Sequence, residues 1–431
     1  MTGSAKPPLI HAARAHQLAL DYGTPIHIYD EKSIRERARA LNAAFAWNHG
    51  FREYFAVKAT PNPAILSILA QEGCGCDCAT ATELMLADAC GITGDALMLS
   101  SNDTPAEDYR LARDLGAIIN FDADDMLGFW EEHVGAFPER VCCRVNPGGD
   151  FQVANAIIGT PEDSKFGMTV DQLKTSFAYL RNRGVREFGI HAFLASNTLG
   201  NDYYPQLAHR LFELVRDLTA ELGVRITFVD LSGGVGVAYE PGQEEPDIAQ
   251  IGEGVRRAYE EVLVPAGIEL DIYAELGRWL LGPAGALLTR VIHHKVTYHD
   301  YLGVDACAAN LMRPAIYDAY HHVTSLDHEG EPLEGCYSVV GGLCENNDQF
   351  ARDRALPKTD TGDLLLIHDT GAHGHSMGYN YNGKLRSAEV LLCEDGTDRL
   401  IRRAERVDDY LATLDVTPEG RALLADTKRK R

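Results

Sequence analysis

The stretch Tyr54-Phe55-Ala56-Val57-Lys58 opens the part of the sequence that decides the fold. It is a short apolar run, as expected of a buried strand, and Pro61 and a helical pattern through Ala70 follow it. The same order recurs along the chain, with further strands predicted at 76–78, 96–100, 117–121, 141–145, 188–194, 226–231 and 272–275. Eight strands that alternate with helices predict a (β/α)8 TIM barrel of the α/β class rather than an open doubly wound sheet.

Helical patterns separate these strands. The clearest one places apolar side chains on one face and ends at Gly223, a predicted C-terminal cap; the face is formed by Leu207, Leu211, Leu214, Val215, Leu218 and Leu222. Residues 147–169 are predicted to form a long loop after the fifth strand, and such loops often shape active sites.

The pattern changes near Gly282, after which strands are predicted without helices between them. A turn at 394–397 separates the last two of these strands, which are predicted at 288–298, 337–340, 364–367, 388–392 and 400–401. We therefore predict a barrel over residues 36–282, and a mostly β domain made of residues 1–35 and 283–431.

Length and charge exclude several classes of protein. The chain has 431 residues, which is too long for one small core, and 40 Lys+Arg against 63 Asp+Glu give a net charge of −23. This acidic balance opposes non-specific binding to nucleic acid or to an anionic membrane. No apolar run approaches the roughly 20 residues of a membrane helix, and residues 1–8 lack the apolar core of a signal peptide.

Ten cysteines without a secretion signal suggest reduced thiols and a cytoplasmic protein. Cys74, Cys76 and Cys78 alternate where a strand is predicted, and no His or Cys cluster completes a ligand set around them. Buried strand thiols are therefore favoured over a metal site, and the Cys142-Cys143 pair is interpreted in the same way.

Unusual residues stand at the carboxyl ends of predicted strands, where TIM barrels carry their active sites. Lys58 ends the first strand, and a lysine facing a barrel mouth either snorkels, pairs, or forms a Schiff base with a carbonyl cofactor. The turn Ser232-Gly233-Gly234-Val235-Gly236 follows the seventh strand, where such barrels bind phosphate. Glu275 ends the eighth strand and Arg278 follows it; the two residues indicate either a cofactor site or a structural ion pair at the rim.

Several segments resemble a known family. Residues 54–59 resemble the Tyr-Ala-Val-Lys-Ala motif of the alanine racemase-like PLP (pyridoxal 5'-phosphate) enzymes, and residues 275–278 resemble their Glu-Pro-Gly-Arg. Asp77 and Glu83 are similar to the acidic pair of the ornithine and diaminopimelate decarboxylases. The segment 342–348 resembles the Cys-Glu-Ser-x-Asp motif of the diaminopimelate decarboxylases, and Gly371-Ala372-His373 and Tyr381-Asn382-Gly383 keep the spacing of two more of their motifs. The resemblance covers most of the chain.

The resemblance implies a PLP site and a substrate site. Lys58 would form the Schiff base, and Glu275 would pair with the pyridinium nitrogen. The other implied cofactor contacts are Asp77, Phe193, Ser196, Gly233, Gly234, Gly277, Arg278, His373 and Tyr381. Cys344 would be the proton donor, reaching in from the other subunit of a homodimer through the β domain. The implied substrate contacts are Arg278, Arg313, Tyr317, Glu345 and His373, with Arg313 and Tyr317 on the distal carboxylate and Glu345 on the distal ammonium.

Four positions depart from the family pattern. Phe193 replaces the imidazole that stacks on the PLP ring; a phenyl ring can stack but cannot titrate. His373 replaces a tyrosine, and we expect its charge to vary near neutral pH. Asn346 replaces the serine after Cys344-Glu345, and Leu276 replaces the proline of Glu-Pro-Gly-Arg.

The resemblance implies decarboxylation of meso-diaminopimelate to L-lysine and CO2, a step of lysine biosynthesis. Decarboxylation of ornithine, lysine or carboxynorspermidine is the nearest alternative, although the first two lack a distal carboxylate and would leave a buried Arg313 unpaired. An amino-acid racemase would share the lysine motif without needing the Cys344-Glu345 segment. A non-catalytic PLP-binding regulator is a further alternative, which retention of Lys58, Glu275 and Cys344 opposes.

Overall fold

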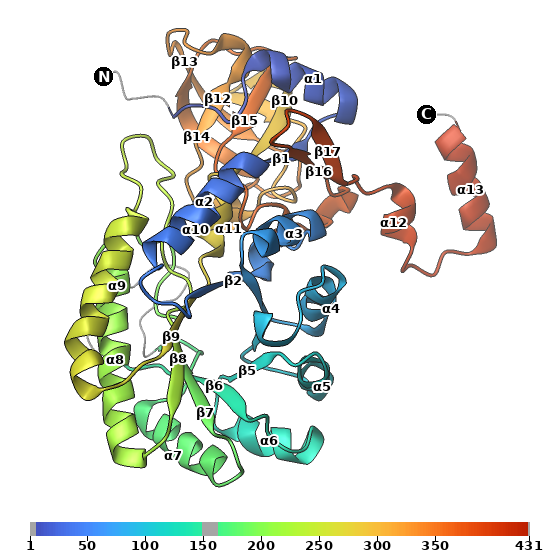
Figure 1. Cartoon of the computed structure of the whole chain (residues 1–431). Coiled ribbons are helices and arrows are strands. Elements are labelled where there is room, and N and C mark those ends of the chain that lie inside the picture. Colours follow the sequence, from blue (N-terminus) through green and yellow to red (C-terminus); the bar gives the residue numbers. More distant parts are fainter. Residues whose placement is uncertain (1–5, 149–162, 430–431) are drawn as a thin grey trace.

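The computed structural model describes residues 6–148 and 163–429. The chain folds into a barrel and a second, mostly β domain, which lie one above the other in Figure 1. The predicted loop at 147–169 lies largely outside the described residues. No helix in the described ranges is both long and apolar enough to cross a bilayer.

The barrel is a closed ring of parallel strands in the order of the sequence, as predicted. The ring closes where the first strand pairs with the last, through Arg52 opposite Tyr273. Its strands are β2 (Arg52–Ala56), β3 (Gly75–Cys78), β4 (Leu97–Ser100), β5 (Ile118–Phe121), β6 (Arg140–Arg144), β7 (Glu187–His191), β8 (Ile226–Asp230) and β9 (Asp271–Ala274). Each lies within three residues of a predicted strand at its start and its end.

Helices cover the outside of the barrel (Figure 1). They are α2 (Glu31–Ala44), α3 (Pro63–Gln71), α4 (Ala81–Ala89), α5 (Ala106–Asp114), α6 (Asp125–His133), α7 (Val170–Arg181), α8 (Tyr203–Leu222), α9 (Ile248–Val262) and α10 (Gly277–Leu281). Local chemistry sets their ends: Asn62 caps α3 before Pro63, and Thr169 and Gln172 form a capping box on α7. Gly223 caps α8 in the left-handed region with φ 63°, as predicted.

The barrel is filled by side chains and is no pore. Its interior holds a cluster of Tyr54, Met98, Ile118, Cys142, Phe228 and Tyr273. Gly189 is needed there, because a Cβ at this position would lie 2.0 Å from the Phe228 ring. Cys76 and Cys78 lie in β3, Cys142 and Cys143 lie in β6, and all are buried free thiols, in keeping with the strand interpretation.

The second domain is a sheet whose main path runs β14-β13-β11-β10-β1-β16-β17, with β15 pairing β10 and β12. The N-terminal strand β1 is central: it pairs antiparallel with β10 and parallel with β16. The strands are β1 (Ile26–Asp30), β10 (Gly285–Val296), β11 (Asp300–Val304), β12 (Val323–Ser325), β13 (Gly335–Val340), β14 (Gln349–Leu356), β15 (Leu364–Ile367), β16 (Ala388–Leu392) and β17 (Asp398–Arg402). The helices are α1 (Ala12–Tyr22), α11 (Arg313–Tyr317), α12 (Val407–Leu411) and α13 (Pro418–Arg429).

Helix α2 lies between the two sheets in the sequence. Its buried residues Ile34, Ala38 and Leu41 belong to the same apolar core as the barrel. The domain boundary predicted at residue 36 falls inside this helix. Strands β1, β11, β12 and β14 were not among the predicted strands.

Candidate active site

A cavity of about 470 Å³ lies at the carboxyl ends of the barrel strands, against the second domain. Most of the predicted site residues line it: Lys58, Phe193, Ser196, Gly233, Gly234, Glu275, Gly277, Arg278, Arg313, Tyr317 and His373. The carboxyl ends of the barrel strands supply the residues from Lys58 to Arg278, and the second domain adds Arg313, Tyr317 and His373, so that the cavity joins residues more than 300 positions apart.

Lys58 lies in a short 3-10 turn, Val57–Ala59, two residues beyond the end of β2. The predicted placement at the strand end is therefore off by this turn, because the ladder to β3 ends with Ala56 opposite Asp77. The Lys58 side chain is half exposed, and its Nζ lies 3.9 Å from Asp77 Oδ2. Burial, together with the charge of Glu275, raises the pKa of Asp77 well above its usual value.

A turn of small residues follows β8. Gly234 adopts φ +125°, and a Cβ at Gly233 would lie 3.1 Å from the backbone oxygen of Glu275. Arg278 lies beside this turn, where its Nη2 donates to Ser196 Oγ at 3.3 Å and its Nη1 donates to Tyr239 Oη at 2.9 Å. A guanidinium and a hydroxyl next to a glycine turn suit a phosphate.

Glu275 is a buried carboxylate at the cavity wall. Ser232 Oγ donates to its Oε2 at 2.8 Å, whereas its Oε1 has no hydrogen-bond partner among the described residues. His191 Nε2 lies 3.2 Å from that Oε1, outside hydrogen-bonding geometry. Burial opposes ionisation, but His191, Lys58 and Ser232 outweigh it and lower the pKa of Glu275. No ion pair joins Glu275 to Arg278 in the described ranges, so a structural ion pair at the rim is not what these residues form.

Phe193 and His373, the two main departures from the family pattern, both line the cavity. The Phe193 ring meets Phe166 edge-on at a centroid distance of 6.4 Å. Burial and the nearby cations Arg278, Arg313 and Lys58 lower the pKa of His373 well below its usual value. This shift opposes the expectation that the charge of His373 varies near neutral pH, because burial and the neighbouring cations both favour the neutral imidazole.

Arg313 begins α11 and is buried at the cavity. Its Nη1 donates to His321 Nε2 at 2.9 Å, and its guanidinium lies 4.7 Å from the centre of the Tyr239 ring. No carboxylate of the described residues lies within ion-pair distance of Arg313. Tyr317, at the end of the same helix, also lines the cavity.

Cys344, Glu345 and Tyr381 do not reach this cavity within the chain. They are exposed on the second domain, where Tyr381 Oη donates to the Cys344 carbonyl at 3.4 Å. The Cys344 N–H donates to Asn382 Oδ1 at 2.7 Å. The structure therefore separates the predicted proton donor from Lys58 of the same chain.

Several polar residues at the site were not predicted from the sequence. Ser100, Arg144 and His191 are the last residues of β4, β6 and β7, so the strand-end rule could have found them. Arg144 Nη1 pairs with Asp122 at 2.7 Å, and its Nε donates to His191 Nδ1 at 3.1 Å.

Comparisons with known proteins agree with this site. The family model for the pyridoxal-binding domain of pyridoxal-dependent decarboxylases matches residues 31–282. The chain is 41% identical to Protein TabA of Pseudomonas amygdali pv. tabaci, over 93% of this chain and 94% of the relative. It is 34% identical to the diaminopimelate decarboxylase of Methanothermobacter thermautotrophicus, over 94% of each.

Solved structures give the same result. Diaminopimelate decarboxylase from M. jannaschii in complex with L-lysine superposes with a TM-score of 0.86 at 29% identity, covering 94% of this chain and 95% of that one. The Helicobacter pylori enzyme complexed with L-lysine gives a TM-score of 0.83 at 27% identity, covering 92% of this chain and 98% of that one. The chain belongs to the family of pyridoxal-dependent decarboxylases, and it is a PLP-dependent amino-acid decarboxylase.

Proposed function

We propose that this enzyme decarboxylates meso-diaminopimelate to L-lysine and CO2. The observation that carries the proposal is Arg313, a buried guanidinium at the cavity with no carboxylate partner among the described residues. A buried cation without a counter-charge is costly, so a substrate with a second carboxylate suits this site. As substrates, ornithine and lysine each have one carboxylate, which is the one that leaves, so they have no second carboxylate for Arg313. Relatives named diaminopimelate decarboxylase support the same substrate.

The residues of the cavity fit PLP. Glu275 Oε1 is a buried acceptor without a hydrogen-bond partner in the described part of the chain, as a protonated ring nitrogen would require. Gly233 and Gly234 supply backbone N–H groups, and Arg278 and Ser196 supply side-chain donors, next to each other as a phosphate needs. When bound, PLP supplies the electron sink for the bond that breaks.

Each side chain then has a role. Lys58 would hold the cofactor covalently, with Asp77 beside its amine. Phe193 would pack on the ring. Gly277 lets the chain pack closely at the wall of the site, since a Cβ there would lie 2.9 Å from Ala59 Cβ. Neutral His373 would donate a hydrogen bond without changing charge near pH 7.

We also propose that the active site is completed by a second subunit. Cys344, Glu345 and Tyr381 are exposed and away from their own cavity, while the substrate needs a proton donor and a partner for its distal ammonium. A two-fold dimer that brings these residues to the partner's cavity would supply both, with Cys344 as the proton donor and Glu345 as the ammonium partner. Arg313 and Tyr317 would hold the distal carboxylate from within the chain.

Subunit mixing tests the shared site. Lys58→Ala and Cys344→Ala are each expected to be largely inactive. After refolding of an equal mixture, about half of the dimers are mixed, and each mixed dimer has one intact site, so activity should return to about a quarter of wild type. If subunits exchange and the mixture stays inactive, Cys344 does not act in trans.

The substrate is tested by CO2 release from meso-diaminopimelate, lysine, ornithine and carboxynorspermidine. We expect turnover of diaminopimelate to exceed the others. Arg313→Met should lower kcat/KM for diaminopimelate through the loss of about 2–5 kcal/mol of transition-state binding. The same variant should lower kcat/KM for lysine much less. Faster turnover of carboxynorspermidine, or equal losses on both substrates in Arg313→Met, would contradict the proposal.

A further inference from the structure

Arg313 is held by two aromatic side chains that come from different domains. His321 lies in the loop before β12 of the second domain, and Tyr239 lies in the barrel loop between β8 and α9. The Tyr239 and His321 rings meet edge-on at a centroid distance of 5.0 Å, and each contacts the guanidinium. The three side chains therefore touch one another pairwise and form a closed triangle beside the cavity.

The hydrogen bonds of His321 fix the direction of this contact. Its Nδ1 lies 2.8 Å from the His368 carbonyl, which can only accept, so Nδ1 carries the ring proton. Its Nε2 is then an acceptor, and Arg313 Nη1 donates to it at 2.9 Å. Burial and the charge of Arg313 lower the pKa of His321 well below its usual value, so the ring stays neutral and keeps this acceptor.

Tyr239 joins this triangle to the predicted phosphate site. Its ring lies against the Arg313 guanidinium, while its hydroxyl accepts from Arg278 Nη1 at 2.9 Å. One tyrosine thus separates two arginines, neither of which has a carboxylate partner in the described ranges. A phenol between them keeps the two cations apart and gives each of them a defined orientation.

We propose that His321 and Tyr239 are positioning residues that hold Arg313 ready for the distal carboxylate of the substrate, and so set specificity for substrates that carry one. The inference rests on the proposed function. A free arginine has many rotamers to lose on binding an anion, and a guanidinium that is already fixed loses fewer. One of its five N–H groups is used by His321, which leaves others for the ligand.

The test measures binding rather than turnover. L-lysine, the proposed product, keeps the distal carboxylate, whereas cadaverine has the same two amines without it. Calorimetric titration of the holoenzyme with each ligand gives a ratio of dissociation constants that isolates the carboxylate. Wild type should bind L-lysine more tightly than cadaverine.

Variants of His321 separate positioning from folding. His321→Leu removes the acceptor and should reduce the L-lysine preference by about 10- to 100-fold, the loss expected for a hydrogen bond to a charged group. His321→Gln can still accept from Arg313 and should recover most of the preference. His322→Leu is the matched control, because His322 contacts the His368 ring and the Tyr320 hydroxyl instead of Arg313; this variant should leave the ratio unchanged.

Variants of Tyr239 test the same contact from the barrel side. Tyr239→Phe keeps the ring and loses the bond to Arg278, so the L-lysine preference should remain while cofactor retention weakens. Tyr239→Leu loses both the aromatic ring and the hydrogen bond to Arg278, and it should reduce the preference for L-lysine. This second variant tests the proposal even if His321→Leu fails to fold.

The outcomes are distinguishable. A wild-type enzyme that prefers cadaverine contradicts the proposed distal-carboxylate site and, with it, the positioning role. A wild-type preference for L-lysine that persists in folded His321→Leu and Tyr239→Leu overturns the positioning role alone. A preference lost in both and restored by His321→Gln supports it.

Discussion

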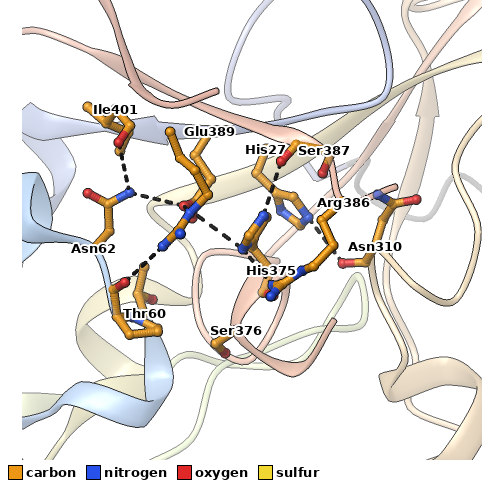
Figure 2. A network of polar contacts seen from close by, with 12 residues as sticks. His27, Thr60, Asn62, Asn310, His375, Ser376, Arg386, Ser387, Glu389 and Ile401 are labelled. Carbon is orange, nitrogen blue, oxygen red and sulfur yellow. Dashed lines mark hydrogen bonds and ion pairs between the residues drawn. The ribbon is translucent and has the colours of Figure 1, made fainter. Parts of the chain in front are cut away.

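Two buried glutamates of this enzyme differ in how their oxygens are satisfied. Glu389 lies where the second domain meets the barrel, and Glu275 lies at the cavity wall. Tyr29 Oη donates to Glu389 Oε1 at 2.7 Å, and Asn62 at 3.0 Å and Arg402 both donate to Oε2, as Figure 2 shows in part. Among the described residues, Glu275 has a hydrogen-bond donor on one oxygen only, while His191 Nε2 lies 3.2 Å from the other without hydrogen-bonding geometry.

This difference distinguishes a buried carboxylate with a structural role from one with a functional role. Burial opposes ionisation of both, and neighbouring groups lower both pKa values. The pKa shift therefore does not distinguish them, whereas the hydrogen bonds do. A fully satisfied carboxylate stabilises the fold, and an unsatisfied one next to a cavity indicates a ligand.

The Glu389 network acts on the segment that follows Lys58. Asn62 bonds to Glu389, Thr60 Oγ1 donates to the Gly371 carbonyl at 2.6 Å, and Arg402 donates to the Pro61 carbonyl at 2.9 Å. Figure 2 shows how residues of both domains converge there. The network thus fastens the backbone beyond Lys58 to the second domain.

The largest effect is expected at Lys58 itself. Lys58→Ala should lower kcat by at least about 10³-fold and should remove borohydride fixation of the cofactor, because no other amine is proposed to bond it. Peptide mapping of the reduced wild-type enzyme should find the cofactor on Lys58. A modified peptide elsewhere, or a variant with near-normal turnover, would show that another lysine holds the cofactor.

Glu275→Gln should follow in size. The amide cannot keep a ring nitrogen protonated, so kcat should fall by about 10²- to 10⁴-fold. The thermal midpoint should fall less than in a variant of Glu389, because Ser232 is the one hydrogen-bond donor to this carboxylate among the described residues. A large loss of stability with little change in kcat would place Glu275 among the structural carboxylates.

Glu389→Gln should give the reverse pattern. Replacement should lower the free energy of unfolding by about 1–3 kcal/mol, since the network loses its charge but keeps its shape. The kcat should change by less than about threefold. Glu132→Gln, at an exposed site on α6, is the control for loss of one charge. Chemical denaturation and initial rates measure the two effects separately.

Much of the fold was predictable, because the barrel repeats one pattern. Apolar runs such as 54–58 mark the strands, and the strand-end rule identified Lys58 and Glu275. Strand β14 was missed because Arg352, Asp353 and Arg354 interrupt its apolar pattern.

The rest of the site depends on contacts that no local pattern records. His321 is identified by its hydrogen bond with Arg313. Glu389 is identified by its hydrogen bond with Asn62, which lies more than 300 positions away in the sequence. The neutral state of His373 follows from burial and from cations contributed by three distant segments, which the sequence alone does not place together.

The last effect appears only when the pH falls, and it concerns His27, a buried neighbour of the Glu389 network. Its Nε2 bonds to the Asn310 carbonyl at 3.1 Å, its Nδ1 has no partner among the described residues, and its ring meets His375 edge-on (Figure 2). Burial lowers the pKa of His27 to about 4, although Glu389 favours the charged form and Arg386 opposes it.

Because the folded-state pKa lies below the unfolded value of 6.5, the unfolded chain binds more protons between pH 6.5 and pH 4. The free energy of unfolding should therefore fall as the pH drops through this window, by up to about 3 kcal/mol from His27 alone. His27→Gln cannot titrate, so its thermal midpoint should fall less steeply from pH 6.5 to pH 4.5 than that of wild type. His49→Gln, at an exposed site, should keep the wild-type slope. Equal slopes in wild type and His27→Gln would mean that His27 takes up its proton while folded, and that the network tolerates the charge.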